Sequence, residues 1–219
     1  MDAQELLIWV RGTGLQIAAA VFVLGMSYRM LHLLLIGRKK SLAEARGSEW
    51  AGGLRTMWQR NFVLPRLSPR GRFTFVAGYV FHLGFFVTLF FLSQHIALFR
   101  AVFGFGWPAL PRGAIDISAV LALAAMVALL AHRLVDPVKR LLSDYQDYLT
   151  WALSFLPLLT GFMLLREIAF EYVTLLTLHI ASVELLLIAA PFTNLAHMFS
   201  TFISRWYNGA VMGFKGIQT

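Results

Sequence analysis

Four of the six histidines in the sequence lie within or at the margins of strongly apolar segments. They are His82, His95, His179 and His197. An ionisable side chain at membrane depth is costly in free energy, so its presence there marks a functional site by default. One such histidine could be a packing residue. Four of them, two in each of two segments, favour ligation of haem iron by pairs of imidazole rings.

The second histidine pair has a regular helical spacing. His179 and His197 are 18 residues apart. Because this separation is five turns of an α-helix, both rings are expected on one face of a single helix, about 27 Å apart. Pro191 lies between them and can kink that helix.

The first pair fits a single helix less well. His82 and His95 are 13 residues apart, which corresponds to a rise of about 19.5 Å and a rotation of about 220° on an ideal helix. The two rings therefore share a face only if the helix is locally distorted. Gly84 and Ser93 are the candidate positions for such a distortion.

Composition identifies the surroundings of these residues as lipid. The chain has 219 residues, of which 58% are hydrophobic and 14% charged, whereas soluble domains contain about 45–50% apolar and about 25% charged residues. This excludes a soluble enzyme. Because a transmembrane helix needs about 20 mostly apolar residues, we predict an all-α integral membrane bundle of five helices in one domain, residues 1–219. The expected spans are residues 15–36, 73–99, 114–134, 148–165 and 172–199.

The distribution of basic residues predicts the orientation. Of the 19 Lys and Arg residues, 14 fall in the link of residues 37–72, in the link between the third and fourth spans, or in the C-terminal tail. By the positive-inside rule the N-terminus is outside and the C-terminus cytoplasmic. His82 then lies with His197 in the inner half of the membrane. His95 lies with His179 in the outer half, so the bundle could hold two stacked haems, each between two histidines.

The excess of basic residues has further interpretations. A net charge of +8 is explained by topology in a membrane protein, so no nucleic-acid partner is expected. The basic link of residues 37–72 is larger than topology needs. It can dock an acidic partner subunit, because a patch of one sign attracts complementary charge, or it can bind anionic lipid.

Several kinds of chemistry are excluded. The chain has no cysteine, so it forms no disulfide and holds no iron–sulfur cluster or covalently attached c-type haem. It has no phosphate-binding loop, dinucleotide-binding glycine motif, zinc-binding His-Glu-x-x-His or nucleophile elbow. The catalytic centre for any terminal substrate is therefore expected on another chain.

Three polar residues near the outer ends of the expected spans are candidates for a quinone site. Gln94 adjoins His95, and Arg100 and Arg112 flank a link rich in Phe, Gly, Trp and Pro. Aromatic residues are ordinary at membrane interfaces. The same link can instead form a lid over a quinol pocket, with an arginine near a haem propionate or a quinol oxygen.

Three more ionisable residues lie in or beside the spans. Glu184 is placed mid-span, five residues after His179, where a lone carboxylate is expensive. It either hydrogen-bonds within the bundle or handles protons. His32 and His132 lie at the cytoplasmic ends of their expected spans, where polar rings are common, so neither is expected to bind haem.

The motifs around the histidines are specific in type and order. They are Phe81-His82-Leu83-Gly84, His95, Arg133-Leu134-x-x-Pro137-x-x-Arg140, Asp147-x-Leu149, Thr160-Gly161, Leu178-His179 and Pro191-Phe192-Thr193-x-Leu195-x-His197. In these motifs, and along all five spans, the sequence resembles the gamma subunit of respiratory nitrate reductase. Related subunits serve sulfite-reductase-associated and heterodisulfide-reductase-like membrane complexes.

The resemblance implies a five-helix cytochrome with two haem b groups that oxidises quinol near the outer face and passes electrons inward to an iron–sulfur partner. It makes His82 and His197 the ligands of the inner haem iron. It makes His95 and His179 the ligands of the outer haem iron. The gap between the first two histidines and the basic first link are both longer here than in the nitrate reductase subunit, which leaves the partner and the terminal substrate open.

The expected function is that of a quinone-reactive electron-transfer subunit of a respiratory oxidoreductase in a bacterial or archaeal cytoplasmic membrane. Electrons would move, in either direction, between the quinone pool and an iron–sulfur or catalytic subunit. An alternative is a small transporter or channel subunit with a histidine–glutamate proton relay, for which Glu184 and Pro191 are the supporting residues. A non-redox membrane anchor, in which the histidines would be replaceable, is a further alternative.

Overall fold

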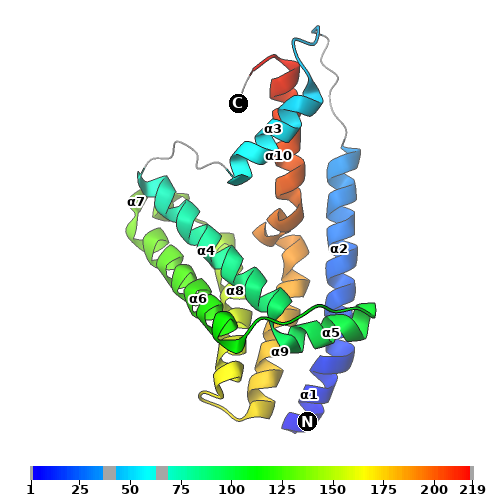
Figure 1. The fold of residues 1–219 in the computed structure, drawn as a ribbon, viewed down its shortest axis with the longest axis vertical. Coiled ribbons are helices and arrows are strands. Elements are labelled where there is room, and N and C mark those ends of the chain that lie inside the picture. Colours follow the sequence, from blue (N-terminus) through cyan, green and yellow to red (C-terminus); the bar gives the residue numbers. More distant parts are fainter. Residues whose placement is uncertain (1, 37–42, 63–68, 218–219) are drawn as a thin grey trace. The chain divides into compact units, whose positions relative to one another are not determined.

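The computed structural model describes residues 2–36, 43–62 and 69–217, and within these ranges every regular element is helical (Figure 1). The all-α class is thus confirmed. The elements are α1 (Ala3–Trp9), η1 (Val10–Gly14), α2 (Leu15–Leu35), α3 (Glu49–Phe62), α4 (Pro69–Phe91), α5 (Ser93–Phe103), α6 (Arg112–Val135), α7 (Pro137–Leu142), α8 (Tyr145–Arg166), α9 (Tyr172–Ala189), η2 (Ala190–Phe192), η3 (Asn194–Ala196) and α10 (His197–Phe214).

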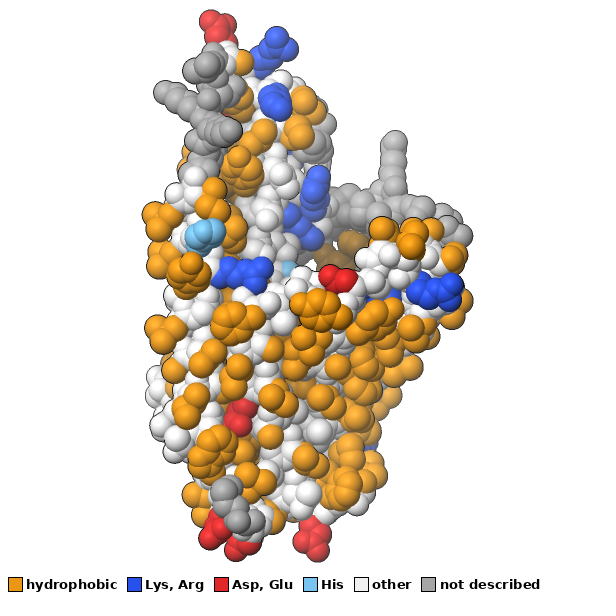
Figure 2. Space-filling view, turned by 180° about the vertical axis from the view of Figure 1, so that it is seen from behind, with side chains coloured by type: hydrophobic (Ala, Val, Ile, Leu, Met, Phe, Trp, Pro, Cys, Tyr) orange, Lys and Arg blue, Asp and Glu red, His pale blue; other side chains and the backbone are white. Residues whose placement is uncertain are grey.

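Five helical stretches are long and apolar enough to cross a membrane, as expected. They are Ala3–Leu35, Gly71–Phe91, Arg112–Val135, Tyr145–Arg166 and Tyr172–Phe192. Helices suit this environment because each backbone polar group finds its partner within the same segment, without water. Hydrophobic side chains cover much of the surface in Figure 2, as contact with lipid requires. The chain is a multi-pass membrane protein.

The first span begins earlier than the expected residue 15. Ala3–Leu35 is helical throughout, with the π-helical turn η1 between α1 and α2. The carboxylate of Asp2 accepts a hydrogen bond from the backbone N–H of Glu5 (2.7 Å), and Glu5 Oε2 accepts one from the backbone N–H of Asp2 (3.0 Å). This reciprocal capping satisfies two donors that the first helical turn leaves unpaired.

The second expected span, residues 73–99, is two helices and not one. Helix α4 ends at Phe91, Leu92 is extended, and α5 begins at Ser93. His82 and His95 therefore lie on different helices. The distortion expected between the two histidines is present. It is a complete break of the helix, and it lies at Ser93, one of the two predicted positions.

The fifth expected span, residues 172–199, is also interrupted. Helix α9 ends at Ala189, two short 3₁₀ turns follow, and His197 is the first residue of α10. Pro191 has no backbone N–H and cannot continue a helical hydrogen-bond ladder. The prediction that His179 and His197 share a face of one continuous helix is therefore wrong.

Arg29, on α2, stabilises the interruption at Pro191. Its guanidinium donates hydrogen bonds to the carbonyl oxygens of Pro191 (2.6 Å) and Thr193 (3.3 Å). The hydroxyl of Thr193 donates to the carbonyl of Ala189 (3.0 Å). These bonds supply partners for carbonyl groups that the end of a helix leaves unpaired.

Contacts divide the chain into two compact units. The first comprises Met1–Ala19 and Pro69–Ile188, and the second comprises Ala20–Ser68 and Ala189–Thr219. His82, His95 and His179 belong to the first unit and His197 to the second. Of the basic link, residues 37–42 and 63–68 lie outside the described residues.

In the first unit, α4 and α6 approach closely at Gly84. A Cβ atom on this glycine would lie 2.5 Å from the carbonyl oxygen of Ser118 and 2.9 Å from Cβ of Ala122. Small residues on both helices therefore permit backbone contact, which is a common way for helices to associate in lipid. This contact holds the helix that carries His82.

In the second unit, α3 and α10 make a similar contact, although the sequence predicted no helix at α3. A Cβ on Gly52 would lie 2.3 Å from the carbonyl oxygen of Gly209 and 2.7 Å from Cα of Gly213. Thr56 is 2% exposed, and a Cβ on Gly209 would lie 2.5 Å from its hydroxyl oxygen. Arg205, on α10, donates a hydrogen bond to the side chain of Asn61 on α3.

Replacing Gly84 by alanine should destabilise the first unit. The added Cβ would clash with the α6 backbone, and overpacking of this kind costs about 1–3 kcal/mol. Gly78 is the matched control on the same helix, since a Cβ there meets nothing within 4 Å. Thermal unfolding in detergent should show a lower midpoint for G84A and an unchanged or slightly higher one for G78A. Equal midpoints would contradict the proposed close contact.

Candidate functional site

The break after α4 fixes the position of His95. Because α4 ends at Phe91, the carbonyl groups of its last four residues have no partner within the helix. His95, in the first turn of α5, points its ring back to them. Its Nδ1 lies 3.0 Å from the carbonyl oxygen of Thr88 and 3.1 Å from that of Leu89. The ring of His95 is therefore part of the cap of α4.

The segment between Arg100 and Arg112, here called the outer link, completes this cap. Trp107 Nε1 donates a hydrogen bond to the carbonyl of Phe90 (2.6 Å). The backbone N–H of Leu110 donates to the carbonyl of Phe91 (3.1 Å). All four carbonyl groups at the end of α4 are thus paired. Because two of their partners belong to the outer link, this link folds back over the end of α4.

His179, on α9, is held by α8. Its Nδ1 lies 3.1 Å from the carbonyl oxygen of Pro157 and 3.2 Å from the hydroxyl oxygen of Thr160. The ring rests against Gly161, where a Cβ would lie 3.0 Å from Cε1 of His179 and 3.3 Å from its Nδ1. The Thr160-Gly161 motif therefore supplies a hydrogen-bonding hydroxyl and the space for the ring.

The structure brings His95 and His179 together in the first unit. Their ring centroids are 6.2 Å apart, and the ring planes are inclined by only 14°. A carbonyl oxygen can only accept, so Nδ1 of each ring carries the proton and Nε2 keeps its lone pair. Among the described residues neither Nε2 forms a hydrogen bond.

This separation matches two ligands on opposite sides of one metal ion. Metal–nitrogen bonds of about 2 Å, with about 1.1 Å more from each nitrogen to its ring centroid, put the two centroids about 6.2 Å apart. Ligating histidines usually donate their other N–H to a carbonyl or carboxylate, as both rings do here. The two rings are nearly parallel, and their centroid spacing and Nδ1 hydrogen bonds make them candidate axial ligands of one bis-histidine haem.

His82 and His197 show the same local arrangement, each within its own unit. Nδ1 of His82 lies 2.7 Å from the carbonyl oxygen of Gly78, one turn earlier on α4. Nδ1 of His197 lies 2.7 Å from the carbonyl oxygen of Asn194 in η3. In both rings Nδ1 is therefore the nitrogen that donates to the backbone, while their pairing stays a prediction.

The three quinone-site candidates have different surroundings. Gln94 is exposed and accepts a hydrogen bond from the hydroxyl of Ser93 (2.9 Å). Arg100 lies against the outer link, since a Cβ on Gly106 would lie 3.2 Å from its Nε. Arg112 donates a hydrogen bond to the carbonyl of Leu165 at the end of α8. Gln94 and Arg100 are thus on the helix that carries His95, whereas Arg112 ties α6 to α8.

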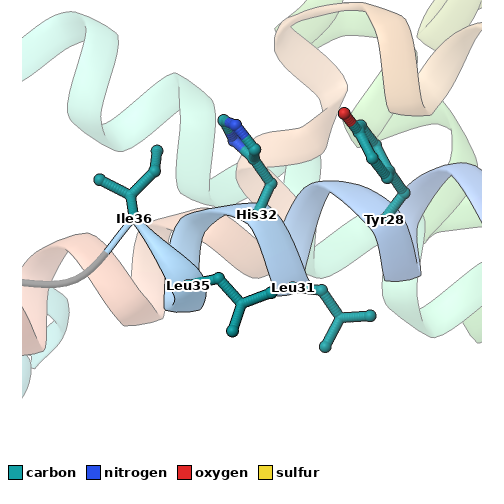
Figure 3. A pocket seen from close by; sticks show the side chains of 5 residues that line it. All are labelled: Tyr28, Leu31, His32, Leu35 and Ile36. Carbon is teal, nitrogen blue, oxygen red and sulfur yellow. The ribbon is translucent and has the colours of Figure 1, made fainter.

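The two histidines not expected to ligate have other aromatic partners. His32 is exposed on α2, with its ring stacked on that of Tyr28 at 6.1 Å between centroids. It lines a surface hollow formed by α2 residues and the adjoining Ile36, in which His32 and Tyr28 point to one side of the helix (Figure 3). His132 packs edge-to-face against Phe73, with 4.7 Å between centroids. Within the described ranges, no group of three or more His, Cys, Asp or Glu side chains is placed to hold a metal ion.

Sequence reasoning missed the ion pairs at the helix ends. Arg133 pairs with Asp147 across the link between α6 and α8 (3.0 Å) and donates to the hydroxyl of Ser143 (2.8 Å). At the opposite ends of these helices, Arg166 pairs with Asp116 (3.1 Å). The only sequence signal was the presence of opposite charges at the ends of neighbouring spans.

Comparison with known proteins gives one relative and no function. A protein of Nitratidesulfovibrio vulgaris (strain Hildenborough), described without a function, is 38% identical over 130 residues. The match covers 59% of this chain and 57% of that relative's length. No model of a known protein family matches the chain, and no solved structure matches it. The function therefore has to be inferred from the geometry of the site.

Proposed function

We propose that the chain is a cytochrome b with two haems that acts as the quinone-reactive membrane subunit of an oxidoreductase complex. The observation that carries this proposal is the His95–His179 pair, with 6.2 Å between ring centroids and 14° between ring planes. Each ring is oriented by a hydrogen bond from Nδ1 to a backbone carbonyl. A neutral imidazole whose Nε2 carries a lone pair can serve as an axial ligand of haem b.

Each haem, when bound, supplies reversible one-electron chemistry at its iron. His95 and His179 would hold the outer group, and the resemblance assigns His82 and His197 to the inner one. The polypeptide sets the orientation of the rings through the helix breaks and the α8 contact, and its apolar helices exclude water. The resemblance of the motifs to the nitrate reductase gamma subunit supports the same assignment of ligands.

Quinone is proposed to react beside the outer group. Gln94 and Arg100, on the helix that carries His95, can donate hydrogen bonds to a quinone oxygen. The outer link, whose Trp107 and Leu110 close over the end of α4, covers this region as a lid would. Arg112 is less suited to the role, since its guanidinium binds the end of α8.

We propose that the chain lies in a bacterial or archaeal cytoplasmic membrane, in the orientation that its basic residues predict. With the N-terminus outside and the C-terminus cytoplasmic, α3 and α10 face the cytoplasm. Arg55, Arg60 and Arg205 of these helices add positive charge there. We propose that an iron–sulfur or catalytic partner subunit docks on this side and exchanges electrons with the inner haem in either direction.

Haem content of single variants tests the proposal. The purified protein should contain two b-type haems per chain, measured as pyridine adducts. H95A and H179A should each lose one haem, and the double variant should lose no more, because both residues hold the same group. H82A and H197A should behave likewise toward the other haem.

The matched control is H32Q, which changes an exposed histidine and should retain both haems. A folded protein that binds no haem, with adequate haem supplied during expression, would overturn the proposal and favour the proton-relay transporter. Loss of both haems on replacing His32 would show that haem content reports folding and not ligation.

A second prediction concerns Gly161. An alanine Cβ there would lie 3.0 Å from Cε1 of His179, so the ring must shift by a few tenths of an ångström. G161A should change the low-spin ferric electron paramagnetic resonance signal of one haem and leave the other unchanged. Gly113 is the control, because a Cβ there meets nothing within 4 Å. An unaltered spectrum in G161A would contradict ligation by His179.

A further inference from the structure

Glu184 is a buried carboxyl group that the proposed haem sites do not use. It lies on α9 and is 7% exposed. Its Oε1 has no hydrogen-bond partner among the described residues. An ionised carboxylate without a partner is disfavoured in such surroundings, so the charge of this group depends on other charge nearby. A buried ionisable side chain in a membrane helix is therefore a candidate for a functional residue.

The first helix is shaped to receive this carboxyl. A Cβ on Gly14 would lie 2.6 Å from Glu184 Oε1 and 2.8 Å from the ring of Trp9. Gly14 ends the π-helical turn η1, and single π-helical turns are frequent at functional sites. A Cβ on Gly12, in the same turn, would meet nothing within 4 Å. The recess is therefore specific to the position facing Glu184.

Glu184 is close to His179 without touching the ring. Five residues along α9 correspond to a rise of about 7.5 Å and a rotation of about 140°. His179 faces α8, where Thr160 binds both its ring and the hydroxyl of Ser182 (3.2 Å each). Glu184 faces the first helix instead. Any influence between the two sites is therefore electrostatic, and it acts through an interior of low dielectric constant.

No charged side chain among the described neighbours of Glu184 offsets its charge. Trp9 and Gly14, which form the recess, are neutral. Arg11 belongs to the same turn, but its side chain is exposed. The charge state of Glu184 is therefore open to influence from the His95–His179 site, which belongs to the same unit and includes a residue of the same helix.

We propose that Glu184 is the redox-linked proton acceptor of the His95–His179 haem site, an inference that rests on the proposed function. When one electron from a hydroquinone enters that site, the carboxylate of Glu184 binds one proton and becomes a carboxylic acid. When the electron leaves, the O–H bond breaks and the proton is released. Each cycle thus balances one electron with one proton and leaves the net charge of this region unchanged.

The test is a potentiometric titration of both haems at several pH values in the wild-type protein and in E184Q. Protonation accompanies reduction, so the midpoint potential of one haem should fall as pH rises, by up to about 59 mV per tenfold change in proton concentration for one electron. E184Q should lose this dependence and keep two haems. E171Q, which changes an exposed carboxylate just before α9, should retain it.

Infrared difference spectra of the reduced and oxidised protein give a second readout. A protonated-carboxyl band should appear on reduction in the wild type and be absent in E184Q. G14A should shift this band, because its Cβ would displace the carboxyl, whereas G12A should not.

The outcomes separate the two proposals. A haem-free protein overturns the proposed function and this inference with it. Two haems with pH-independent potentials, or a dependence that survives in E184Q, overturn the inference alone.

Discussion

The requirement that backbone carbonyls be paired in lipid determines the site on which the rest depends. A helix that stops inside a membrane leaves four carbonyls without partners, each expensive to bury. The break after Phe91 leaves four carbonyl groups of this kind. His95 Nδ1 pairs with two of them, those of Thr88 and Leu89. The ring is thereby fixed with its Nε2 unprotonated and available. One side chain therefore both pairs carbonyl groups at the helix break and presents a nitrogen that can bind a metal ion.

The same principle operates at the second interruption. Pro191 ends the regular part of α9, and Arg29 supplies hydrogen bonds to the carbonyls of Pro191 and Thr193. His197 follows directly, at the first residue of α10. Two of the four candidate ligands therefore come just after a helix break. Breaks of this kind permit ring directions that the regular rotation of a straight helix would not provide.

Apolar composition and the length of the apolar segments were enough to predict the all-α class and five membrane helices. The interruptions were predicted only as local distortions, because Ser93 and Pro191 mark a place but not the hydrogen bonds formed there. The pairing of His95 with His179 was anticipated, whereas the π-helical turn was not. No residue type in Val10–Gly14 distinguishes it from an ordinary helix containing glycine. Helix α3 was missed because its contact with α10 depends on close backbone packing and not on apolar length.

The π-helical turn η1 has a consequence for length variation in this segment. Such a turn is an α-helix with one extra residue, so it rotates everything before it by about 100° relative to a continuous α-helix. A chain lacking one residue between Val10 and Gly14 would still form a long first helix. Its Trp9 counterpart would face a different direction and would no longer line the recess at Gly14. Sequence length across this one turn is therefore a marker of whether a related chain keeps the tryptophan wall of that recess.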